Sequence, residues 1–243
     1  MYITSICYLG AKSLSHVLSC IERCKEKLLA VGQESTEARR QIVRSVMSYW
    51  ADQPGVGANV VDKLLNYSVL TPASVIEWAL VEAGPESLSL NHVWEMVSTT
   101  VNKVNNRVRQ IVAARPVPAA IPGLETVAMV EGDADGDGNM LGEGGKAAYE
   151  AALEAYETTL ESARIEQKQI AELLLGALAR IARGEGQGPG EEEWALNMEV
   201  DVVGEYRVWM RWWGGQWLTA FARRYRAEGV VSEEEVKALG FCI

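Results

Sequence analysis

Two long stripes of apolar residues, each spaced like the face of a helix that packs along another helix, constrain this fold most. The first stripe runs through Leu90, Val93, Val97, Val101, Val104, Val108 and Ile111. The second runs through Tyr149, Leu153, Tyr156, Leu160, Ala163, Gln167, Ile170, Leu174 and Ala177. Steps of three and four residues keep a stripe on one partner along a coiled-coil seam. The stripes therefore predict two long arms that pack together.

The rest of the chain also has helical spacing, and no segment alternates with the period of two that indicates a strand. Ser35 or Thr36, Thr71 before a proline, and Ser232 before three glutamates are typical helix starts. We interpret Gly32 as a helix stop, and Pro54 with Gly55 as the end of another helix. The fold class predicted is all-α: stacked antiparallel helix pairs, a HEAT-like or ARM-like helical repeat, with a long antiparallel coiled-coil hairpin.

Two segments differ in composition from the helical parts. Residues 116–146 combine prolines with glycine, aspartate and glutamate, and have too few bulky residues to bury, so we expect a disordered acidic insert between the two hairpin arms. Residues 184–193 are rich in glycine and glutamate and predict a flexible loop. We expect residues 1–243 to form a single all-helical domain, a C-terminal fragment that lacks its first helices and exposes an apolar face there.

The charge and hydropathy of the chain exclude some classes of function. The net charge is −10 at pH 7, which argues against broad, non-specific binding of nucleic acid by the whole surface. Much of the acid lies in the two glycine-rich segments, and small basic clusters remain, such as Arg223-Arg224-Tyr225-Arg226. No apolar run reaches the roughly 20 residues that span a bilayer. We therefore expect an intracellular protein without a membrane segment.

The residues that usually carry catalysis or bind metals form no complete set. His16, Cys20 and Cys24 share one helical face, but three ligands in a line on a helix cannot surround zinc. Asp133, Asp135 and Asp137 begin like a calcium loop, but the twelfth position is Gly144 where the loop needs a glutamate. We predict no catalytic residue, no cofactor and no metal site, and keep a calcium-responsive role for residues 133–144 as a third hypothesis.

A cluster of tryptophans after residue 200 is the best candidate for a partner site. The candidates are Trp209, Arg211, Trp212, Trp213 and Trp217. Their spacing spreads the rings over more than one face of a helix, so core packing and an exposed binding patch both remain open. Aromatic rings beside arginines also permit stacking on RNA bases.

Four short motifs, in order over about 100 residues, carry a resemblance to a known family. They are Lys12-Ser13-Leu14-Ser15-His16, Val61-Asp62-Lys63, Val75-Ile76-Glu77-Trp78 and Val93-Trp94-Glu95. Together they resemble the C-terminal helical domain of the large subunit of the nuclear cap-binding complex, whose fold is similar to the middle domain of initiation factor 4G. The match becomes thinner after residue 116.

The resemblance implies a non-enzymatic scaffold in the nucleus that shuttles to the cytoplasm. Its partners would be a small subunit with an RNA-recognition fold, which reads the 7-methylguanosine cap of mRNA, and factors of mRNA processing, splicing, export and nonsense-mediated decay. Capped RNA would be bound through that small subunit. The main alternative is a helical adaptor of translation initiation, which shares the fold but is not expected to carry the long hairpin.

Overall fold

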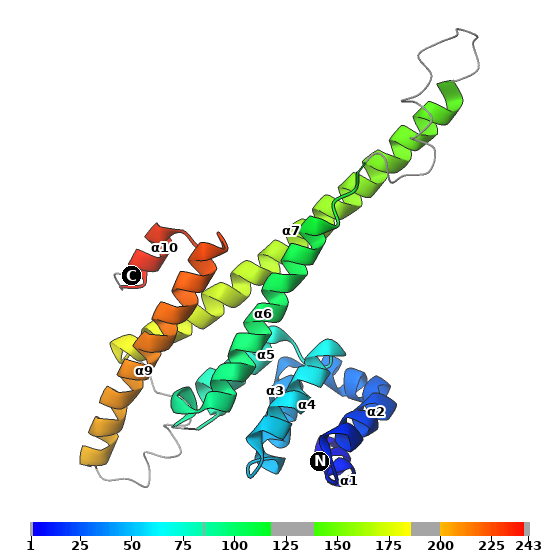
Figure 1. Ribbon diagram of the computed structural model, residues 1–243. Helices are drawn as coiled ribbons and strands as arrows, with labels where there is room; N and C mark the ends of the chain where they lie inside the picture. The colour runs from blue at the N-terminus through cyan, green and yellow to red at the C-terminus, as the bar shows by residue number, and fades with distance from the viewer. Residues whose placement is uncertain (1, 85, 118–138, 186–199, 241–243) are drawn as a thin grey trace. The chain divides into compact units, whose positions relative to one another are not determined.

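The computed structural model describes residues 2–84, 86–117, 139–185 and 200–240, and within these ranges every regular element is helical. They form two compact units (Figure 1). Unit 1 contains residues 1–102 and 168–243, and unit 2 contains residues 103–167. The all-α fold class is confirmed, while the single domain of residues 1–243 stays a prediction.

The first part of unit 1 is a series of helices in which α2 packs on α1, α3 and α4, and α5 packs on α3. They are α1 (Tyr2–Gly10), α2 (Leu14–Glu34), α3 (Thr36–Tyr49), α4 (Pro54–Asn66), α5 (Pro72–Glu77), the π-helical turn η1 (Trp78–Glu82) and the 3-10 turn η2 (Ser87–Ser89). The sequence did not predict α1 as a helix. It packs on α2 and α3, and leaves Tyr8 and Leu9 exposed.

Side-chain caps fix where several of these helices start. The Ser35 hydroxyl accepts a hydrogen bond from the Ala38 N–H at the start of α3. Thr71 and Ser74 form a capping box at α5, with Pro72 at the first helical position. These caps satisfy N–H groups that the first helical turn leaves without partners, and both predicted starts are confirmed.

Two glycine and proline interpretations were wrong. Gly32 does not end α2, which continues to Glu34; a Cβ at Gly32 would lie 2.4 Å from the Val69 carbonyl oxygen, so the glycine permits a close backbone contact. Pro54 does not end a helix but begins α4, because a proline at the first helical position lacks only an N–H that has no helical partner there.

The second part of unit 1 brings distant segments of the chain together. It consists of the start of α6 (Asn91–Ala113), the end of α7 (Asn139–Arg183), α9 (Val200–Ala227) and α10 (Glu233–Ala238). Val93, Val97 and Val101 from the first predicted stripe are buried here, as are Ile170 and Leu174 from the second. Figure 1 shows α9 beside the C-terminal part of α7.

Unit 2 is an antiparallel hairpin of α6 and α7. The Gln167 side-chain amide donates to the Asn105 side-chain oxygen at 3.1 Å, and Arg107 pairs with Glu166 at 2.8 Å. Partner numbers fall on α7 as they rise on α6, which confirms the antiparallel direction. The buried Asn105–Gln167 pair interrupts the apolar seam between the arms.

The predicted insert at 116–146 lies largely outside the described residues, as do residues 186–193 of the predicted loop. The end of the insert was placed too late, because α7 begins at Asn139. At the other end of α7, Gly184 has a φ of 72° and ends the helix, as the left-handed conformation favours glycine.

Candidate interaction surface

The candidate tryptophans lie on one helix, α9, but in three different environments. Trp217 is only 2% exposed, and its ring contacts Trp94 at 4.9 Å and Phe221 at 6.1 Å between ring centroids. It is therefore part of the core where α9 packs on α6. Of the two alternatives kept open for these tryptophans, core packing applies to Trp217.

Trp209 and Trp213 are half-buried and pack against the edge of the same core. Tyr206, Trp209, Trp213 and Trp212 form a chain of ring contacts, with centroids 6.3, 6.4 and 4.8 Å apart in that order. The last two contacts are edge-on, the arrangement that aromatic rings prefer. Each ring therefore restricts the orientation of the next.

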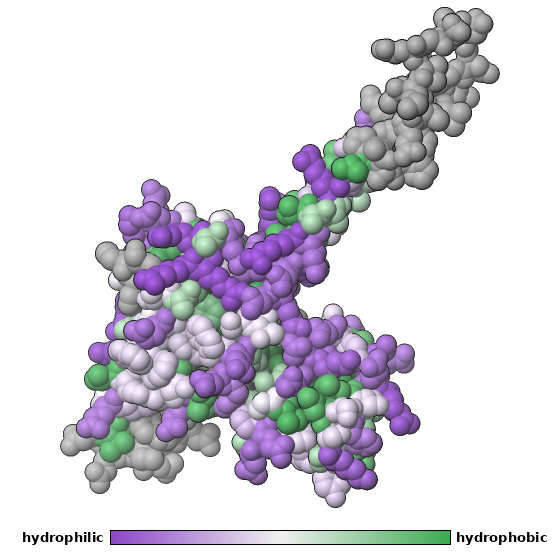
Figure 2. Space-filling view, in the orientation of Figure 1, coloured by the Kyte–Doolittle hydropathy of each residue, from purple (hydrophilic) through white to green (hydrophobic). Residues whose placement is uncertain are grey.

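Trp212 is the member of this chain that faces solvent. It is 56% exposed, and Val208, one helical turn earlier, is 67% exposed. Tryptophan is enriched at protein interfaces, whereas single exposed apolar side chains are common on any surface, and Figure 2 shows hydrophobic residues scattered among hydrophilic ones. The structure thus reduces the sequence candidates to one exposed ring supported by a half-buried neighbour.

Arg211 has a structural role that the sequence did not reveal. A Cβ at Gly184 would lie 2.2 to 2.5 Å from atoms of the Arg211 guanidinium group, so this group lies against the end of α7. A cation at the C-terminus of a helix is favoured by the helix dipole. Nearby, Gly214 lets α9 approach α7, since a Cβ there would be 2.9 Å from the Ile181 side chain. Gly214 packs closely and does not interrupt the helix.

Most of α9 carries only positive charges. Between residues 206 and 227 it carries five arginines, namely Arg207, Arg211, Arg223, Arg224 and Arg226, and no carboxylate. Arg224 lies 3.8 Å from Glu228 and 3.4 Å from the Ser98 hydroxyl. Arg223 and Arg226 are exposed. Among the described helices, α9 therefore combines five arginines with an exposed tryptophan, Trp212.

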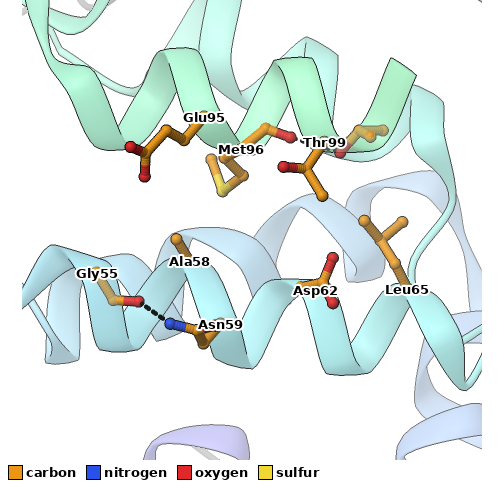
Figure 3. A pocket seen from close by; sticks show the side chains of 9 residues that line it. Gly55, Ala58, Asn59, Asp62, Leu65, Glu95, Met96 and Thr99 are labelled. Carbon is orange, nitrogen blue, oxygen red and sulfur yellow. Dashed lines mark hydrogen bonds between the residues drawn. The ribbon is translucent and has the colours of Figure 1, made fainter. Parts of the chain in front are cut away.

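Unit 1 also has a pocket of about 170 Å³ between α4 and α6 (Figure 3). Asp62 and Glu95 contribute carboxylates, and Met96 contributes an apolar wall. The Thr100 hydroxyl donates to the Met96 carbonyl, and Asn59 donates to the Gly55 carbonyl, so both are bonded within their own helices. Its lining residues include no histidine, cysteine or lysine.

The residues considered as metal ligands differ in exposure. His16 is exposed, while Cys20 and Cys24 are half-buried free thiols; Cys7 is buried, and burial raises the pKa of its thiol. In the described part of the chain, no three histidine, cysteine or acidic side chains are placed to hold a metal ion. The possible calcium-binding residues Asp133, Asp135 and Asp137 lie outside it. No described helix combines the length and apolar character needed to cross a bilayer.

Apolar residues of three of the four resemblance motifs serve packing, whereas residues 12–16 of the first motif are exposed. Val61, Val75 and Val93 are at most 1% exposed, and Trp94 packs on Trp217. A family model described as MIF4G like matches residues 1–229. The chain belongs to this MIF4G-like family. The helical-repeat prediction is thereby confirmed.

Curated relatives agree with the resemblance stated from the motifs. The chain is similar to nuclear cap-binding protein subunit 1 of Schizosaccharomyces pombe, with 33% identity over 105 residues, which is 43% of this chain and 13% of that protein. It is 26% identical over 111 residues to the protein of that name from Homo sapiens, covering 46% and 14% of the two chains. With subunit 1-B of Xenopus laevis the match is 25% over 171 residues, 70% and 21%. The matched regions are thus a small part of each relative.

Proposed function

We propose that this chain is a helical scaffold domain of a nuclear cap-binding complex large subunit and has no catalytic activity of its own. It supports a small subunit with an RNA-recognition fold, and that small subunit reads the 7-methylguanosine cap. The site of action is the nucleus, with shuttling to the cytoplasm. Factors of splicing, export, 3′-end processing and nonsense-mediated decay would dock on the assembled complex.

The observation that carries this proposal is the family match over residues 1–229, together with relatives that are all named as subunit 1 of the cap-binding complex. The division of labour is supported by the shape of the aromatic site. A cap is held between two parallel aromatic rings in a pocket, whereas Trp212 is a single ring on the outside of a helix. This arrangement supports a division of labour in which a partner reads the cap.

The hairpin favours this function over that of a translation-initiation adaptor. The arms α6 and α7 pair in an antiparallel direction, with a buried amide pair in the seam. The nuclear family is expected to carry such a hairpin, and the translation module is not. The calcium hypothesis has no support among the described residues.

Retention on a 7-methylguanosine resin tests the proposal. The chain is mixed with the small RNA-recognition subunit of the same organism, and we expect both to be retained and to be released by free cap analogue. A resin that carries unmethylated guanosine serves as the control. Retention of the chain without the small subunit would contradict the division of labour, and loss of the chain when the small subunit is retained would contradict the scaffold role.

A further inference from the structure

The solvent-facing side of α9 combines an exposed aromatic ring with exposed arginines. At 3.6 residues per turn, Val208, Arg223 and Arg226 lie within about 40° of Trp212 around the helix axis. All four are exposed. Arg223 follows Trp212 by 11 residues, about 17 Å along the axis, which is the length of two or three extended nucleotides. We call Val208, Trp212, Arg223 and Arg226 the α9 face.

The ring at Trp212 is suited to stacking. Its contact with Trp213 at 4.8 Å fixes its orientation, and Trp213 is in turn held by Trp209. A side chain that is already ordered loses less conformational entropy when a ligand stacks on it. Every nucleobase offers a π-face to such a ring, so stacking of this kind does not depend on sequence.

The charges near Trp212 favour a polyanion with regularly spaced charges, such as a nucleic-acid backbone. Arg223 and Arg226 lie on the α9 face, and the helix has no carboxylate between residues 206 and 227. The nearby acids are Glu205 at the start of the face, Glu228, which pairs with Arg224, and Glu233, whose pKa is lowered by Lys237 and by Arg226. Two exposed arginines in line with an exposed indole match a phosphate backbone with a base stacked at one end.

We infer that the α9 face binds single-stranded RNA directly, with a base stacked on Trp212 and phosphates bound by Arg223 and Arg226. This goes beyond the proposed function, which assigns RNA recognition to the small subunit, and does not depend on it. The RNA would be the body of a transcript, because a lone ring cannot enclose a cap. The net charge of −10 opposes RNA binding by the chain as a whole, so we expect binding at this face to be weak.

Fluorescence anisotropy with the chain alone and a labelled, uncapped ten-nucleotide RNA tests this inference. At physiological salt we expect a Kd between about 1 and 100 µM, the range of sequence-independent binding. Trp212→Ala should weaken binding at least about fivefold, because one stacking contact is lost, and Trp212→Phe should restore part of it. The double change Arg223→Gln and Arg226→Gln should reduce the salt slope by about 1.4, at about 0.7 per phosphate contact.

Matched variants on other helices separate this face from general effects. Tyr8→Ala removes another exposed aromatic ring, and Arg23→Gln with Lys27→Gln removes the same charge from α2. Both should bind RNA like the unmodified chain, and the melting temperature of each variant should stay unchanged because the side chains are exposed. Unchanged affinity of Trp212→Ala, or an equal loss in the α2 variant, would overturn the inference.

A glutamate decapeptide provides the last arm of the experiment. It carries a similar charge but no rings, so it should compete poorly with the RNA. If it binds as tightly as the RNA and ignores Trp212→Ala, the face takes acidic peptides and the RNA inference is wrong. Capture on cap resin through the small subunit is measured separately, so failure here leaves the proposed function standing.

Discussion

Gly32 and Gly176 both lie inside long helices, but their surroundings are opposite. A Cβ at Gly32 would meet the Val69 carbonyl oxygen at 2.4 Å, whereas a Cβ at Gly176 would meet no atom within 4 Å. A glycine in a helix costs stability relative to alanine unless a close contact requires it. The same substitution at the two sites should therefore have opposite effects.

We expect Gly32→Ala to lower the free energy of unfolding by about 1 to 3 kcal/mol, the usual cost of overpacking. Gly176→Ala should raise it by about 0.5 to 1 kcal/mol, because alanine has the higher helix propensity. Urea unfolding followed by circular dichroism measures both. A Gly32→Ala variant that is more stable than the unmodified chain would mean that the close contact with Val69 does not require glycine at this position.

These residues also show where sequence reasoning stops. The caps at Ser35, Thr71 and Ser232 could be predicted because a cap depends on neighbours three residues away. The role of Gly32 could not, because its contact comes from a residue 37 positions later. The sequence does not distinguish Trp212 from Trp217. The packing of α9 on α6 buries Trp217 and leaves Trp212 exposed.

At the scale of single elements, the Glu235 carboxylate connects α10 to Lys168 of α7, and Arg183 of α7 also donates to the Leu239 carbonyl at the end of α10. Glu235 accepts hydrogen bonds from the Ser232 N–H at 2.6 Å and from the Lys168 ammonium group at 2.5 Å. Lys168 also donates to the Val230 carbonyl. These contacts, above all the one with Lys168, lower the pKa of Glu235 to about 2.

The pH dependence of this attachment follows from the direction of the shift. A lowered pKa in the folded state means that the stabilisation is fully present above the unfolded value, about 4.3, and is lost as the pH falls towards 2. Glu235→Gln should therefore lower the melting temperature at pH 7 but have little effect near pH 2. The neighbouring change Glu234→Gln is the control. A difference between Glu235→Gln and the unmodified chain that is the same at both pH values would contradict this account.

The hairpin seam depends on a polar pair. Asn105 and Gln167 are buried, and the Asn105 Oδ1 atom accepts a hydrogen bond from the Gln167 amide. The Asn105 Nδ2 atom has no hydrogen-bond partner among the described residues. Removing one partner leaves the other buried without a hydrogen bond, whereas removing both leaves an apolar seam. Polar residues in such seams also fix the register of the arms.

A double-mutant cycle tests this pair. Asn105→Leu and Gln167→Leu should each cost about 1 to 3 kcal/mol, and the double variant should be close to the unmodified chain. Thermal unfolding of the four proteins measures the coupling. Additive losses would show that the two side chains act independently. The stripe that contains Gln167 was visible in the sequence, but its pairing with Asn105 was not, since Asn105 lies beside the first stripe.

On the scale of the whole molecule, the core of unit 1 is assembled from two separated segments. Its residues come from Ile3 to Val101 and from Ile170 to Val236, with the hairpin between them. The family motifs indicated the first segment, because they lie on α2, α4, α5 with η1, and α6, in order. They could not predict that the end of α7 and all of α9 complete the same core.

Shortening the hairpin tests this construction. In the observed register Gln110 lies near Ser162, so residues 111–161 can be replaced by a short glycine-serine turn. We expect unit 1 to keep its melting temperature within a few degrees, because none of its core residues is removed. Circular dichroism should show a loss of helix in proportion to the residues deleted. Unfolding of the shortened chain would show that the hairpin is required for unit 1.

The unequal lengths of the two hairpin arms have a consequence for backbone dynamics. With Asn105 opposite Gln167, the end of α6 at Ala113 lies near Thr159, so about 20 residues of α7 extend beyond their described partner helix. With no described partner helix beside them, those turns depend on helix propensity, through residues such as Ala151, Ala152 and Glu154. Amide hydrogens along α7 should therefore exchange with solvent at graded rates, fastest near Tyr149 and slowest near Leu174, where exchange waits for global unfolding.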